Sequence, residues 1–174
     1  VGIILGFTGP IESLTPAMRD GAKMAFEEAS NSGYLLGGET ITVLEGDSTC
    51  ADSAAGTAAA ENLVAQGVSA IMGADCSGVT GAINANVAVP NGILMVSPSA
   101  TSPGLSGIND AGTFWRTAPS DAKGGKVLAN LALSKGISSI AITYTNNDYG
   151  RGLAEVFEKA FTSGGGTVTA VASH

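Results

Sequence analysis

Two short polar segments of this 174-residue chain contain residue types that can bind a small charged solute. The first, Gly73–Ser77, follows an apolar run and leads into a helical pattern. Unpaired N–H groups at a helix N-terminus carry partial positive charge, so they suit a carboxylate or a phosphate, and the Ser77 hydroxyl adds a donor. The plainer alternative is that Ser77 only caps its own helix, and this segment taken alone favours that alternative.

The second segment, Ser97–Thr101, has three hydroxyl side chains in five residues and also follows an apolar run. Its backbone carbonyls and the Thr101 hydroxyl could receive an ammonium group, although an ordinary polar turn would have the same composition. Ligands of open parallel sheets bind beyond the carboxyl ends of the strands. Because both segments would lie at that edge, we expect them to form half of a pocket for the charged end of a small solute.

Tyr149 is a further candidate because it begins an expected helix just beyond the end of an expected strand. A tyrosine there could close over a ligand. It could equally pack beneath its own loop, and the local sequence favours neither interpretation.

Several catalytic and cofactor-binding arrangements lack the residues that they need. The only histidine is His174, which leaves no Ser-His-Asp or Cys-His arrangement, and no Cys-x-x-Cys or histidine cluster has metal-site spacing. Gly150-Arg151-Gly152 begins like a dinucleotide fingerprint, but Glu155 stands where the third glycine belongs. We therefore expect a binding protein rather than an enzyme, with no cofactor and no metal.

Alternating strand and helix patterns must position these candidates. The expected strands are Val1–Gly6, Thr40–Glu45, Val68–Met72, Ile93–Val96, Thr113–Ala118, Ser139–Tyr144 and Thr167–Ala172. The expected helices start near Thr15, Asp52, Ser77, Asp121 and Asp148 and end near Gly33, Gly67, Pro90, Lys135 and Ser163. Such alternation predicts a parallel sheet with helices on both faces, and Thr117–Asp121 is the expected boundary between two groups of elements.

Three helices carry more detailed expectations. Thr15 is expected to cap the first helix, with Pro16 at the first helical position, and Asp52 is expected to cap the second. The helix from Asp121 is expected to bury one face, formed by Val127, Leu128 and Leu131.

Composition narrows the possible partners. The chain has 8 basic and 15 acidic residues, for a net charge of −7, and shows no basic patch of the kind that binds nucleic acid. An anionic membrane surface is an equally poor partner. No apolar run approaches the roughly 18–20 residues that span a bilayer, so we expect no direct membrane insertion. The chain starts inside a strand-like run without a signal peptide, so an exported parent would be present in a mature or trimmed form.

Cys50 and Cys76 are the only cysteines. They could be two buried thiols of a cytosolic protein or one disulfide formed in an oxidising compartment. Each follows an expected strand, which would place both at the same edge of a parallel sheet and favours the disulfide.

Taken together, five segments in order resemble the type I periplasmic binding proteins of ABC importers, particularly the leucine/isoleucine/valine-binding branch. These segments are Gly6–Pro10, Gly73–Gly78, Ser97–Pro103, Phe114–Asp121 and Asn147–Gly150. The resemblance implies an α/β fold with helices on both faces of a parallel sheet. Residues 1–118 would be part of a first lobe, and residues 119–174 the opening β-α-β unit of a second. It also implies export to the periplasm, a Cys50–Cys76 disulfide, a membrane permease as partner, and closure of two lobes on a ligand.

The resemblance further implies a set of ligand residues. Ser77 and the Thr101 backbone would bind the α-carboxylate of an amino acid. The Ser99 or Ala100 carbonyl, together with the Thr101 hydroxyl, would hold the α-amino group. Tyr149 would reach the ligand from the second lobe.

Leu14 matches a position at which relatives often carry an aromatic residue over the ligand, so the side-chain preference of this chain stays open. Family members run to roughly twice this length. We therefore expect an N-terminal fragment with weak or absent affinity, and open sheet edges that favour self-association.

The expected function is the binding of branched-chain amino acids or related amides for an ABC importer. The alternative is the ligand-sensing domain of a receptor or regulator with the same fold.

Overall fold

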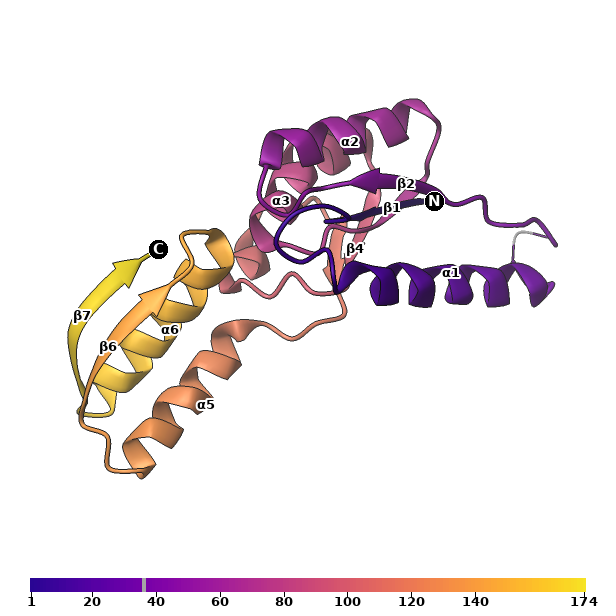
Figure 1. The fold of residues 1–174 in the computed structure, drawn as a ribbon. Coiled ribbons are helices and arrows are strands. Elements are labelled where there is room, and N and C mark those ends of the chain that lie inside the picture. Colours follow the sequence, from indigo (N-terminus) through magenta and orange to yellow (C-terminus); the bar gives the residue numbers. More distant parts are fainter. Residues whose placement is uncertain (36) are drawn as a thin grey trace. The chain divides into compact units, whose positions relative to one another are not determined.

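A computed structural model describes residues 1–35 and 37–174, which form two units (Figure 1). The first unit consists of Val1–Ala100 and Asn109–Thr117, and the second of Thr101–Ile108 and Ala118–His174. The predicted parallel α/β fold is confirmed.

The first unit is built on a five-stranded sheet in the order β2-β1-β3-β4-β5, with every neighbouring pair parallel. Its strands are β1 (Gly2–Leu5), β2 (Leu44–Asp47), β3 (Ala70–Gly73), β4 (Leu94–Ser97) and β5 (Phe114–Arg116). Because all five strands run the same way, their carboxyl ends meet at one edge. Both polar segments predicted to bind solute follow strands at that edge.

Helices cover both faces of this sheet. They are α1 (Thr15–Asn31), α2 (Ser53–Ala65) and α3 (Ser77–Ile83), which continues through the π-helical turn η1 (Asn84–Ala88) into α4 (Val89–Asn91). Figure 1 shows α2 and α3 on one face and α1 on the other. The central strand β1 supplies the middle of the core, since Ile3, Ile4 and Leu5 have no exposed surface.

The ends of several elements differ from the sequence prediction. Asp52 caps α2 as expected, accepting hydrogen bonds from the N–H groups of Ala54 and Ala55 at 2.8 and 3.0 Å. Thr15, by contrast, is the first residue of α1 rather than its cap, and its hydroxyl donates to the Glu12 carbonyl. The helix from Ser77 also runs past Pro90 and ends where Gly92 adopts a left-handed conformation.

Strand β2 begins at Leu44, four residues after the predicted start, and ends at Asp47. It lies at the edge of the sheet and pairs only with β1, so one side of its backbone needs no strand partner. Polar residues such as Glu45 and Asp47 are therefore tolerated within it, and they hide its bounds in the sequence.

The second unit contains the 3₁₀ turn η2 (Pro103–Gly107), α5 (Asp121–Ser134), β6 (Ser139–Tyr144), α6 (Asp148–Ser163) and β7 (Thr167–Ser173). Strands β6 and β7 form a parallel two-stranded sheet. Helix α6 packs its apolar face inward, with Phe161 fully buried and its ring stacked at 5.7 Å from that of Phe157.

The buried face of α5 differs from the predicted one. Val127, Leu128 and Leu131 are each more than half exposed, whereas Gly125 and Ala129 are buried. A Cβ on Gly125 would lie 2.8 Å from a methyl group of Val156 on α6. The two helices therefore approach each other through small residues, and this turns the large apolar side chains of α5 outward. Among residues 1–35 and 37–174, no helix combines the length and the apolar character needed to cross a membrane.

Candidate functional site

Hydrogen bonds from hydroxyl groups join the two predicted solute-binding segments at the carboxyl edge of the first unit. Strands β3 and β4 are neighbours, so the loops that follow them start side by side. Ser97 Oγ donates to the Ala74 carbonyl at 2.5 Å, and Ser99 Oγ donates to the Asp75 carbonyl at 2.9 Å. The Ala100 N–H in turn donates to Ser97 Oγ at 3.0 Å. Segments that are more than twenty residues apart in the chain thus form one surface.

Ser77 lies at the start of α3 and is almost fully buried. The residue at the N-cap position is Cys76, whose side chain makes no capping hydrogen bond. Ser77 is therefore the first helical residue rather than the cap. Thr80, one turn further on, donates its hydroxyl to the Ala74 carbonyl at 3.0 Å and so fixes the first turn of α3 to the end of β3.

Asp75 is a central residue of this edge that the sequence analysis did not single out. It is 3% exposed, and its carboxylate accepts hydrogen bonds from Gly6 N–H at 2.7 Å, Ser48 Oγ at 3.2 Å and Cys76 N–H at 3.0 Å. An acidic residue between a buried strand and a helix was the one available signal. Its distant partners Gly6 and Ser48, which are 69 and 27 residues away, gave no signal in the sequence.

The predicted disulfide between Cys50 and Cys76 is present, with 5.3 Å between the Cα atoms. It ties the loop after β2 to the start of α3. Thr49 and Cys50 both have positive φ angles, at 55° and 64°, which side-chain-bearing residues rarely adopt. Together with the hydrogen bonds around it, the disulfide holds this loop in a conformation that the chain alone would not favour.

Asp47 holds the loop after β1 against the loop after β2. Its carboxylate accepts hydrogen bonds from Thr8 Oγ1 at 2.5 Å, from Thr8 N–H at 3.3 Å and from Thr49 N–H at 2.8 Å. Partial burial of Asp47 acts to raise its pKa. The hydrogen bonds from Thr8, Thr49 and Phe7 outweigh that effect, and the pKa of Asp47 is lowered.

We predict that this carboxylate makes the protein less stable in acid. A carboxyl group whose pKa is lower in the folded state contributes stability above its unfolded pKa, and that contribution is lost as the pH falls through the folded pKa. The loss is therefore expected from about pH 4 downward, where an unperturbed aspartate titrates. Thermal melting at pH 6 and at pH 3 should show a smaller pH-dependent drop for Asp47→Asn than for the unmodified protein. Equal drops would contradict the assignment.

The remaining predicted ligand residues are distributed over both units. Leu14 lies just before α1 and is 56% exposed. The Ala100 side chain is fully buried, and its carbonyl accepts a hydrogen bond from Arg116 Nη1 at 3.1 Å. Thr101, the next residue, begins the second unit, and its carbonyl accepts from Asp121 N–H at 3.0 Å.

Tyr149 belongs to the first turn of α6 in the second unit and is 45% exposed. Asn147 caps this helix by accepting the Gly150 N–H at 2.8 Å. The cap directs the chain sharply from β6 into α6, and it leaves the Tyr149 ring at the surface.

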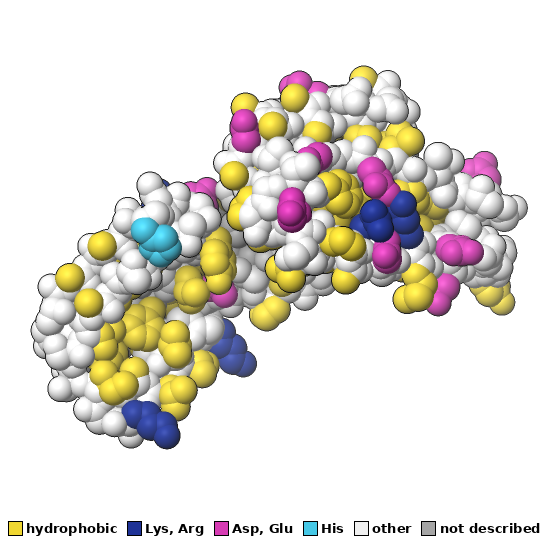
Figure 2. Space-filling model, in the orientation of Figure 1, with side chains coloured by type: hydrophobic (Ala, Val, Ile, Leu, Met, Phe, Trp, Pro, Cys, Tyr) yellow, Lys and Arg dark blue, Asp and Glu magenta, His cyan; other side chains and the backbone are white. Residues whose placement is uncertain are grey.

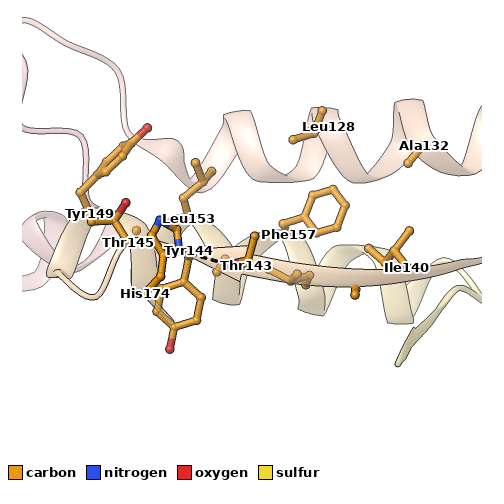
Figure 3. Close-up of a pocket in the computed structure, with 14 residues that line it drawn as sticks. Leu128, Ala132, Ile140, Thr143, Tyr144, Thr145, Tyr149, Leu153, Phe157 and His174 are labelled. Atoms are coloured by element: carbon orange, nitrogen blue, oxygen red, sulfur yellow. Dashed lines mark hydrogen bonds between the residues drawn. The ribbon is translucent and has the colours of Figure 1, made fainter. Parts of the chain in front are cut away.

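The second unit also contains an apolar cavity of about 590 Å³ that the sequence did not reveal (Figure 3). Its walls come from α5, β6 and α6, with Leu128, Ile140 and Phe157 among the lining side chains. Tyr149 and His174 lie at one end, where His174 Nδ1 is 3.1 Å from Thr143 Oγ1. Figure 2 shows hydrophobic side chains gathered over this unit.

Two further observations bear on the chemistry of the described residues. Within residues 1–35 and 37–174, no group of three or more His, Cys, Asp or Glu side chains could hold a metal ion. Ion pairs in the same ranges are found at Arg19–Asp20 and Lys23–Glu45. Both pairs lie on or beside α1 and contribute nothing to the sheet edge where the loops after β3 and β4 meet.

This chain is similar in sequence to one family of known proteins. A sequence profile of the family described as periplasmic binding protein matches residues 1–174. Leu/Ile/Val-binding protein homolog 3 of Brucella melitensis is 29% identical over 166 residues, which cover 95% of this chain and 44% of that protein. Leu/Ile/Val-binding protein BraC3 of Rhizobium johnstonii is 31% identical over 168 residues, with the same coverage. The chain thus spans less than half the length of these relatives.

Solved structures extend the similarity to three dimensions. The branched-chain amino acid transporter substrate-binding protein LivJ of Streptococcus pneumoniae, in complex with isoleucine, matches with a TM-score of 0.84 and 28% identity, over 99% of this chain and 48% of that one. The leucine-binding protein LivK of Thermotoga maritima matches with a TM-score of 0.86 and 26% identity, over 98% of this chain and 47% of that one.

Proposed function

The chain belongs to the periplasmic binding protein family, and on this premise we propose that it is part of the extracytoplasmic solute-binding component of an ABC importer for branched-chain or related amino acids. Relatives named for the binding of leucine, isoleucine and valine support the substrate class. The partner of the full-length protein would be a membrane permease, to which it delivers its ligand. Its action would be binding and release without chemical conversion.

The observation that carries the proposal is the set of hydroxyl-to-carbonyl hydrogen bonds between the loops after β3 and β4. These bonds give a fixed surface at a sheet edge where ligands of parallel α/β folds bind. The Ser77 hydroxyl, the N–H groups of the first turn of α3 and the Thr101 N–H would bind the α-carboxylate. Backbone N–H groups at a helix start are suited to that charge.

The Ser99 carbonyl is a better acceptor for the ammonium group of the ligand than the Ala100 carbonyl. The Ala100 carbonyl already accepts a hydrogen bond from the Arg116 guanidinium, and a second cation beside it would be repelled. We therefore assign the ammonium to the Ser99 carbonyl and the Thr101 hydroxyl. Leu14 and Tyr149 are retained as candidate contacts for the rest of the ligand in the full-length protein.

Ser77→Ala tests the carboxylate assignment. A hydrogen bond to a charged group is worth about 1.5–3 kcal/mol, so affinity of the full-length protein for leucine should fall by about 10-fold to 100-fold. Ser53→Ala, at an exposed serine that begins α2, is the matched control and should bind leucine normally. Unchanged leucine affinity in Ser77→Ala, measured by calorimetry, would remove Ser77 from the site.

A further inference from the structure

Asp75 makes hydrogen bonds with several separate segments of the proposed ligand edge. Its carboxylate Oδ2 accepts the Gly6 N–H, and Oδ1 accepts both the Ser48 hydroxyl and its own neighbour's N–H at Cys76. Its carbonyl accepts the Ser99 hydroxyl. One buried residue thus connects the segments that follow β1, β2 and β4 to the start of α3.

These contacts suit a carboxylate and no close substitute. A carboxylate only accepts hydrogen bonds and has about four acceptor positions on two oxygens. All three partners here are donors. An asparagine would turn an NH₂ group toward at least one of them, which would leave two donors facing each other at a buried position.

The disulfide does not duplicate this role. Cys50–Cys76 joins the loop after β2 to the start of α3. The hydrogen bond from Gly6 to Asp75 is a separate link from that corner to the end of β1, and the bond from Ser99 is a link to the loop after β4. Loss of the Asp75 carboxylate would therefore remove the hydrogen bond between Gly6 and the start of α3 even with the disulfide intact.

We propose that Asp75 is the positioning residue of the ligand site. Its carboxylate fixes the turn that leads to Ser77, and thereby the Asp75 carbonyl to which Ser99 is bonded, without touching the ligand. This inference rests on the proposed function, since it concerns the same site. Ser77 lies two residues beyond Asp75, and Ser99 is hydrogen-bonded to the Asp75 backbone. Binding groups must be held to about 0.5 Å to keep their effect, so a small shift of this corner would weaken both contacts.

The test uses the full-length protein and calorimetry with leucine, together with ¹⁵N-resolved NMR of the backbone amides. Asp75→Asn should lower leucine affinity at least 10-fold in protein that is still folded at the temperature of measurement, and the amide resonances of Gly6 and Ser77 should move. Asp110→Asn is the matched control. Asp110 also accepts a backbone N–H, from Gly112 at 2.9 Å, but it lies outside the site. Asp110→Asn should leave both the leucine affinity and the amide resonances of Gly6 and Ser77 unchanged.

A milder variant keeps the inference testable if Asp75→Asn does not fold. Ser48→Ala removes one of the three donors and leaves the carboxylate in place, and it should weaken leucine binding by about 2-fold to 5-fold. Folded Asp75→Asn or Ser48→Ala protein that binds leucine as tightly as the unmodified protein would overturn the positioning role while leaving the proposed function standing. Failure of the unmodified protein to bind any amino acid would instead overturn the proposed function.

Discussion

Replacement of Gly73 by alanine is expected to destabilise the first unit by about 4 kcal/mol or more, which is enough to prevent folding of a marginally stable domain. Gly73 is the last residue of β3, and its φ angle of 132° is one that residues with a side chain rarely adopt. A Cβ at this position would lie 2.0 Å from the carbonyl oxygen of Ile4. Because Ile4 is the residue paired with Gly73 in the centre of the sheet, neither backbone can move without breaking the pairing of β1 with β3.

Gly92→Ala is the matched control for Gly73→Ala. Gly92 also has a positive φ angle, at 63°, but a Cβ there would meet no atom within 4 Å. Its replacement should cost only the backbone penalty of about 1–2 kcal/mol. Urea unfolding of both variants gives the comparison, and equal losses would show that the contact with Ile4 is not the cause.

Removal of the disulfide in Cys50→Ala/Cys76→Ala is expected to have the next largest effect. The bond links residues 26 positions apart, for which chain-entropy arguments predict a stabilisation of about 3.5 kcal/mol. Relaxation of the strained positive φ angles at Thr49 and Cys50 in the released loop would offset part of this loss. Urea unfolding of the variant and of the unmodified protein should differ by about this amount, and addition of a reductant should bring the unmodified protein close to the variant.

Thiol titration provides an independent check on the disulfide. Under denaturing, non-reducing conditions the protein should react with no thiol reagent, since neither cysteine is free. Two reactive thiols, or a variant as stable as the unmodified protein, would contradict the stabilising role of the bond.

Much of the fold could be predicted because apolar residues recur with different periods in strands and in helices. Strand β6 occupies the same residues as its prediction, Ser139–Tyr144, and Asp52 caps α2 as expected. The buried face of α5 could not be predicted. There, Gly125 permits a close helix contact, and that contact outweighs the larger apolar area offered by Leu128 and Leu131.

The candidate site was predictable in part. The alternation of elements placed the loops that carry Ser77 and Ser99 at one edge of the sheet, and the pairing of β3 with β4 makes those loops neighbours. The role of Asp75 did not follow, since two of its three donors, a backbone N–H and a hydroxyl, lie far away in the chain. Contacts of side chains with distant backbone groups leave no periodic signal, and the same is true of the bond from Arg116 to Ala100.

Calorimetric titration of the full-length protein with a panel of amino acids, amides and urea tests the central claim most directly. The panel should include leucine, isoleucine and valine beside acidic, basic and aromatic amino acids. We predict saturable binding of at least one branched-chain amino acid with a stoichiometry near one, and loss of that binding when the α-carboxylate is converted to an ester. Absence of binding for every member of the panel would contradict the assignment of this chain to amino-acid capture.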